Sequence, residues 1–105
     1  MIYALAQLSF TDLPRYRRYQ SKFAESFAGS GGDVLAADED VQILEGEWPY
    51  QKAVLLRFPD EQSYRRWYTS DAYQAIIGDR QGATLGSVVL IRGLPAVTDP
   101  GAGRG

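Results

Sequence analysis

The chain has 105 residues, a length typical of a single domain. Apolar residues make up 45% of it, and the net charge of −2 excludes a broad attraction to nucleic acid or to an anionic membrane. Cysteine and histidine are both absent, which removes the disulfide, the thiolate nucleophile, the usual general base and the commonest metal ligands. No apolar run approaches the roughly 20 residues that span a bilayer. We therefore expect a cytoplasmic protein without metal or cofactor.

The first third of the chain predicts a strand followed by a helix. Residues 2–9 have the composition of a strand. Thr11 or Asp12 is suited to cap the helix that follows, and Pro14 falls in its first turn, where a missing N–H does no harm. The helix carries an aromatic stripe and ends at the glycine-rich segment 29–32, because glycine adopts the left-handed conformation of a helix C-terminus without strain.

The middle of the chain predicts strands around an acidic turn. Residues 34–37 and 41–46 are either two short strands or one interrupted strand, with three acidic residues between them. The apolar segment 52–58 predicts a further strand. Pro49 lies just before it, at a position where a central strand would lack a hydrogen-bond donor.

The last third predicts helical segments and a final strand. Asp60 is suited to cap one helix, and Ser70 or Asp71 to cap a second segment directly after it. Residues 85–93 predict the last strand, and the segment 94–105, rich in proline and glycine, predicts a loose tail.

This order of elements predicts an α+β domain over residues 1–93. Strand, helix, strands, helix and strand in that order form a βαββαβ pattern, the ferredoxin-like arrangement, in which both helices cover one face of an antiparallel sheet. Residues 54–56 and 88–91 are continuous apolar runs and send apolar side chains to both faces of the sheet. Because the helices cover one face, we expect a homodimer that packs sheet against sheet; the alternative is a modestly apolar face exposed to solvent.

An arginine near the end of the last helical segment is the most informative charged residue. Tyr73 and Arg80 are seven positions apart, about two helical turns, and so share a face with the isoleucines between them. Three roles are open for Arg80. In the first, its aliphatic chain packs against the apolar stripe while the guanidinium reaches solvent. In the second, the guanidinium pairs with a strand carboxylate such as Glu45. In the third, it binds the carboxylate or phosphate of a ligand.

The same region supplies the candidate site. If the protein is catalytic, Glu45 and Arg80 are the candidate catalytic residues. Glu45 would orient the arginine and is the best available proton acceptor, for which burial would have to raise its pKa. The residues expected to line a ligand site with them are Trp48, Trp67, Tyr68, Ser70 and Tyr73. Each also has a purely structural interpretation, since aromatic stripes are usually core and Ser70 is suited to cap a helix.

Several of these motifs together resemble one family. The segments LEGEWP at 44–49 and LRFPDEQSYRRWYTSDAYQ at 56–74, followed by Arg80, are similar to the DUF1330 family of small uncharacterised proteins. The family often has a basic residue after its Gly-Gly pair and a glycine-rich turn before Leu-Glu-Gly. This chain has Asp33 and ADED at those places, which argues against an anion site at that edge.

The resemblance implies a dimeric α+β barrel of ferredoxin-like subunits, and it implies no function. Proteins with the same barrel include cofactor-independent monooxygenases, isomerases and decarboxylases, and others that bind haem, which is an analogy of fold alone. We expect either a barrel that binds a small organic acid, with or without a monooxygenase- or isomerase-like activity, or a non-enzymatic dimeric module in which these residues are structural. Whether the protein is an enzyme stays open at this point.

Overall fold

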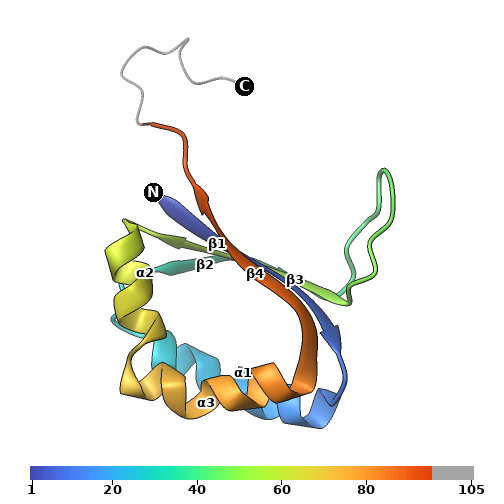
Figure 1. Cartoon of the computed structure of the whole chain (residues 1–105), viewed down its shortest axis with the longest axis horizontal. Helices are drawn as coiled ribbons and strands as arrows, with labels where there is room; N and C mark the ends of the chain where they lie inside the picture. Colours follow the sequence, from blue (N-terminus) through green and yellow to red (C-terminus); the bar gives the residue numbers. More distant parts are fainter. Residues whose placement is uncertain (96–105) are drawn as a thin grey trace.

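The computed structural model describes residues 1–95 of the 105-residue chain. A four-stranded sheet forms one layer, and three helices all lie against one of its faces (Figure 1). The elements in chain order are β1 (Ile2–Phe10), α1 (Leu13–Phe27), β2 (Asp33–Asp38), β3 (Lys52–Phe58), α2 (Glu61–Tyr68), α3 (Asp71–Ala83) and β4 (Thr84–Arg92). The predicted loose tail lies outside the described residues from residue 96 onward.

The sheet confirms the predicted ferredoxin-like topology. Its strand order is β2-β3-β1-β4, and every neighbouring pair is antiparallel. The first strand therefore lies in the middle of the sheet, where Ile2 is opposite Phe58 of β3 and Arg92 of β4. None of the helices in the described part of the chain has the length and apolar character needed to cross a membrane.

Each helix begins at the residue type that the sequence predicts. Asp12 accepts a hydrogen bond from the backbone N–H of Arg15, and Asp60 accepts one from that of Ser63. Ser70 Oγ accepts a hydrogen bond from the backbone N–H of Tyr73 at the start of α3. These side chains satisfy N–H groups that have no partner within a helix, and so they fix where each helix starts.

The predicted strand at residues 41–46 does not form, and this part of the sequence prediction was wrong. The chain leaves the sheet after Asp38 and runs through a long loop that projects from the body of the domain before β3 (Figure 1). The loop begins with a turn in which the Asp40 N–H donates to the Asp38 carboxylate at 2.7 Å. β3 is already paired with β2 on one side and β1 on the other, so it has no free edge for another strand.

Both faces of the sheet carry apolar side chains, as predicted from the continuous apolar runs. The helix-facing side chains form the core, in which Phe58 is fully buried among aromatic side chains of α1 and α2. The opposite face, called the outer face below, has no cover among the described residues. It carries Tyr3, Leu5, Leu55, Val89 and Ile91 on three adjacent strands.

Candidate functional site

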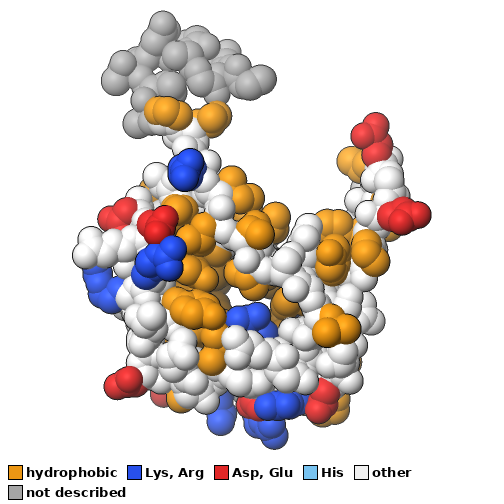
Figure 2. Space-filling view, in the orientation of Figure 1, with side chains coloured by type: hydrophobic (Ala, Val, Ile, Leu, Met, Phe, Trp, Pro, Cys, Tyr) orange, Lys and Arg blue, Asp and Glu red, His pale blue; other side chains and the backbone are white. Residues whose placement is uncertain are grey.

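A cavity of about 200 Å³ lies between the helix-facing side of the sheet and the helices. In the space-filling view the molecule is hollowed there, with apolar side chains around the hollow and basic surface visible within it (Figure 2). Apolar cavities of about 150 Å³ are known to hold one benzene ring. The cavity therefore has the size for a ligand built on a single ring or a short aliphatic chain.

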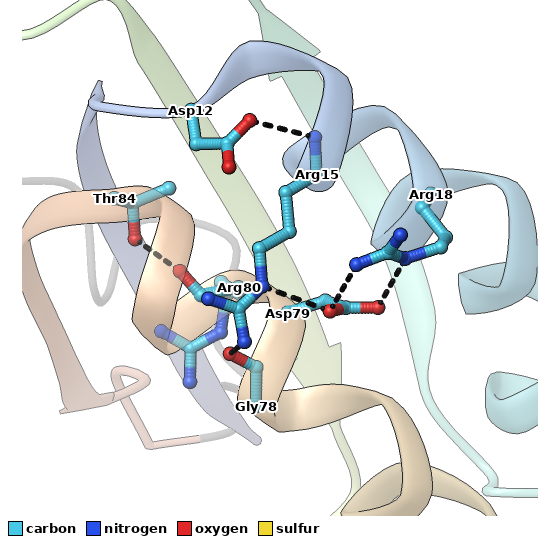
Figure 3. A network of polar contacts seen from close by, with 7 residues as sticks. All are labelled: Asp12, Arg15, Arg18, Gly78, Asp79, Arg80 and Thr84. Carbon is cyan, nitrogen blue, oxygen red and sulfur yellow. Dashed lines mark hydrogen bonds and ion pairs between the residues drawn. The ribbon is translucent and has the colours of Figure 1, made fainter.

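The helix that carries Arg80 is held in place by an ion-pair network on the outside of the helical layer. The Asp79 carboxylate accepts hydrogen bonds from Nε of Arg15 at 3.0 Å and from Nε and Nη2 of Arg18 at 2.9 Å each (Figure 3). Arg15 also donates to the backbone carbonyl of Gly78. The bonds from Arg18 and then Arg15 hold the pKa of Asp79 well below its usual value. This network joins α3 to α1 one residue before Arg80.

Arg80 itself lines the cavity and is half-buried. Its Nε donates to the Tyr73 hydroxyl at 3.3 Å, and that hydroxyl is 2.9 Å from the hydroxyl of Tyr19. Burial lowers the pKa of Arg80, but the nearby Tyr73, Tyr19 and Tyr68 outweigh it and raise the pKa, so the guanidinium stays charged. Burial, with Tyr73 beside it, raises the pKa of Tyr19 far above its ordinary value. The cavity thus holds a fixed cation and a neutral tyrosine hydroxyl.

A second cation enters the cavity from the start of β3. Lys52 is only 4% exposed, and its Nζ lies 4.9 Å from the centre of the Tyr16 ring and 3.4 Å from a carboxylate oxygen of Glu39. Glu39 also accepts two hydrogen bonds from Arg17, both at 2.6 Å. The bonds from Arg17, together with Lys52, lower the pKa of Glu39 to about 2.

The structure brings together four of the predicted site residues. These four line the cavity: Arg80, Trp67, Tyr68 and Tyr73. Ser70 lies next to them but outside the lining, where it caps α3 and donates its own hydroxyl proton to the Trp67 carbonyl. The role of helix cap is therefore sufficient to explain why Ser70 occupies this position.

The other two predicted residues lie in the loop between β2 and β3. Glu45 is exposed there and forms no ion pair with Arg80, so the expected pairing of these two residues was wrong. The reason is the missing strand at 41–46, which would have carried Glu45 into the sheet. Trp48 is half-exposed in the same loop and packs edge-on against Tyr50.

Sequence reasoning missed Lys52, Tyr16 and Tyr19 as lining residues. A usable signal was present for the lysine. Side chains alternate along a strand, so Lys52 shares a face with Leu56 and Phe58, which are buried against the helices. In the part of the chain that the structure describes, no three acidic, cysteine or histidine side chains gather closely enough to hold a metal ion.

These features define an α+β domain of the ferredoxin-like class with a mixed apolar and cationic cavity between sheet and helices. The profile of the family described as "Domain of unknown function (DUF1330)" matches residues 1–94, and the chain belongs to this family. A search of curated proteins found no match.

Solved structures of low sequence identity share the fold. A protein of unknown function from Rhodopseudomonas palustris matches with a TM-score of 0.76 at 15% identity, over 90% of this chain and 83% of its own. SnoaB from Streptomyces nogalater, described as a cofactor-independent oxygenase, matches with a TM-score of 0.63 at 9% identity. The match covers 93% of this chain and 97% of SnoaB. A dimeric ferredoxin-like protein of unknown function from Thermobifida fusca matches with a TM-score of 0.61 at 16% identity, over 86% of each chain.

Proposed function

We propose that this protein binds a small organic acid in the cavity, with Arg80 as the anchor for its carboxylate. The proposal rests on the positive charge of the Arg80 guanidinium, which the described residues leave without a carboxylate partner. Its Nε is used by Tyr73, while its two Nη groups have no hydrogen-bond partner among residues 1–95 and no carboxylate neutralises it there. A half-buried charge without a counter-charge is costly, and a ligand carboxylate would supply that charge with two parallel hydrogen bonds.

The rest of the cavity suits the body of such an acid. Trp67 and Tyr68 present aromatic surface, and Ala4 and Leu8 of β1 form an apolar floor. An aromatic or short aliphatic body would lose contact with water against these walls, which stabilises the complex in proportion to the apolar area buried. The Tyr19 and Tyr73 hydroxyls would orient oxygen atoms of the ligand close to Arg80.

Binding is favoured over catalysis by the cavity's lack of a base. Within residues 1–95 no carboxylate lines it, and the raised pKa of Tyr19 keeps that hydroxyl protonated near neutral pH. A cofactor-independent oxidation or isomerisation is the second candidate, supported by the fold shared with SnoaB, an analogy that does not extend to residues. Oxygen consumption or loss of an aromatic acid in the presence of the protein would identify such an enzyme.

A thermal-shift series tests the ligand proposal. A panel of aromatic and aliphatic acids is expected to raise the Tm of the wild type, by roughly 10 °C or more when the free acid is at about 100 times its Kd. The Arg80→Ala variant should lose this shift, and Arg80→Lys should keep only part of it, because an ammonium cannot form the bidentate pair. Arg66→Ala is the matched control, since Arg66 is exposed on α2.

The proposal fails if no acid in the panel raises the Tm of the wild type. It also fails if the shift survives in Arg80→Ala at the size measured for Arg66→Ala. A reduced Tm of Arg80→Ala without ligand, with no ligand shift in either protein, would instead support a structural role for Arg80.

We also propose that two copies associate through their outer faces. The helices cover only one face of the sheet, while Val89 and Ile91 on the other are 47% and 44% exposed. Leu5 and Leu55 lie beside them in the middle of the sheet, so the apolar side chains form a continuous patch. The Thermobifida fusca protein is described as dimeric, which supports the association of two copies of this fold. The cytoplasmic location stays a prediction.

A further inference from the structure

The cavity contains two cationic side chains and no acidic one among the described residues. Arg80 enters from α3 and Lys52 from β3, and the remaining polar groups of the lining are tyrosine hydroxyls, an indole N–H and the amide of Gln20. Lys52 is the single charged side chain among residues 1–95 that is fully buried. A lysine so placed lacks most of its hydration, and it needs compensation by negative charge or hydrogen-bond acceptors.

The compensation that the chain itself provides to Lys52 is incomplete. Glu39 is its only carboxylate partner in the described part of the chain, at 3.4 Å, beyond the usual length of a charge-assisted hydrogen bond. The same carboxylate is held by Arg17 at 2.6 Å through both of its oxygens. One negative charge is thus shared between two positive ones, and the cluster keeps a net charge of about +1 beside the cavity.

The two cations lie on different sides of the cavity. Lys52 is over the Tyr16 ring, and Arg80 is bonded to Tyr73, while Tyr19 lies between those tyrosines with ring-centre distances of 5.6 and 6.2 Å. Lys52 belongs to β3, whereas Arg80 also lines a second cavity with Ser87 and other residues of β4. The central strand β1 separates β3 from β4, so the tyrosine row connects two cationic ends across it.

We infer that the ligand is a dicarboxylic acid, with one carboxylate on Arg80, a second on Lys52, and an apolar ring or chain over the tyrosine row. This inference rests on the proposed function and adds the second anionic group. The second carboxylate would approach Nζ of Lys52 from the cavity, on a cation that Glu39 only partly neutralises. The two lining charges of +1 each then match a ligand of charge −2.

Isothermal titration calorimetry with matched acids tests the inference. The probes are benzoate, with one carboxylate, and isophthalate and terephthalate, which add a second at two different spacings on the same ring. Wild type is expected to bind at least one of the two diacids about ten-fold or more tighter than benzoate, because the second carboxylate forms a further charge-assisted hydrogen bond with Lys52. Lys52→Met should bring this ratio close to one, because the second carboxylate then has no cation to bind.

A second variant, at Glu39, is expected to change the ratio of diacid to benzoate affinity in the opposite direction. Glu39→Gln removes the charge that competes for Lys52, so the diacid-to-benzoate ratio should rise further above that of wild type. Glu39 is partly exposed and lies outside the helices and strands, so this variant is expected to fold even if Lys52→Met does not. Lys52→Arg keeps a cation at the site and should retain a ratio above one.

The outcomes separate the inference from the proposed function. If wild type binds benzoate through Arg80 but neither diacid more tightly, or if the ratio is unchanged in both Lys52→Met and Glu39→Gln, the second anionic site is overturned and the monoacid site stands. If wild type binds neither benzoate nor a diacid, both are overturned. A ratio that falls in Lys52→Met and rises in Glu39→Gln supports the dicarboxylic acid.

Discussion

Replacing Gly86 with alanine is expected to lower the free energy of unfolding by about 3 kcal/mol or more. Gly86 has a φ of +142°, a conformation that residues with a side chain rarely adopt, and it lies in β4 opposite Leu8 of the central strand. A Cβ at this position would overlap the backbone carbonyl of Gln7. Because the obstacle is backbone in the middle of the sheet, β4 would have to separate from β1 to accept the methyl group.

The matched control for this prediction is Gly78→Ala. Gly78 lies on the exposed side of α3, and a Cβ there meets nothing within 4 Å. Alanine in a helix is favoured over glycine by about 0.5–1 kcal/mol, so this variant should be slightly more stable than wild type. Urea unfolding of both variants measures the difference. Equal stability of Gly86→Ala and wild type would contradict the path of β4 described above.

Introducing aspartate at both Val89 and Ile91 is expected to convert the proposed dimer to a monomer. Both side chains lie on the outer face, opposite Leu5 and Tyr3 of β1. In a sheet-to-sheet dimer the two substitutions would bury four carboxylates without partners, which costs several kcal/mol in total. In the single subunit the same positions are about half exposed, so the fold itself should tolerate the change.

Sedimentation velocity at micromolar concentration distinguishes the two states. Leu13→Asp is the control, because Leu13 is an aliphatic residue of similar exposure but lies on α1, away from the outer face. This variant should sediment as the wild type does. A wild type that already sediments as a monomer, or a double variant that remains a dimer, would contradict association through the outer face.

The fold could be predicted from the sequence because its signals are local. Asp12, Asp60 and Ser70 each cap a helix at the predicted position, and the apolar segment Lys52–Phe58 forms a strand with the predicted bounds. Caps and side-chain alternation depend on a few neighbouring residues, so they can be recognised without knowledge of the tertiary structure. The sheet order then follows from the βαββαβ pattern.

The site was predicted only in part, because it depends on contacts between distant segments. Helical spacing placed Tyr73 beside Arg80, and the structure shows them bonded. The expected partner Glu45 depended on a strand at 41–46, but the chain leaves the sheet after β2 and forms no further strand before β3. Lys52 and Glu39 lie on opposite sides of the loop between β2 and β3. The sequence near either residue does not reveal that the two form an ion pair.

A crystal structure with bound benzoate would test whether the free side of the Arg80 guanidinium binds the carboxylate of a small acid. We expect the benzoate carboxylate within about 3 Å of both Nη atoms of Arg80, with the ring against Trp67 and Tyr68. Benzoate bound elsewhere, with Arg80 unchanged and the cavity filled by side chains or water alone, would contradict the claim.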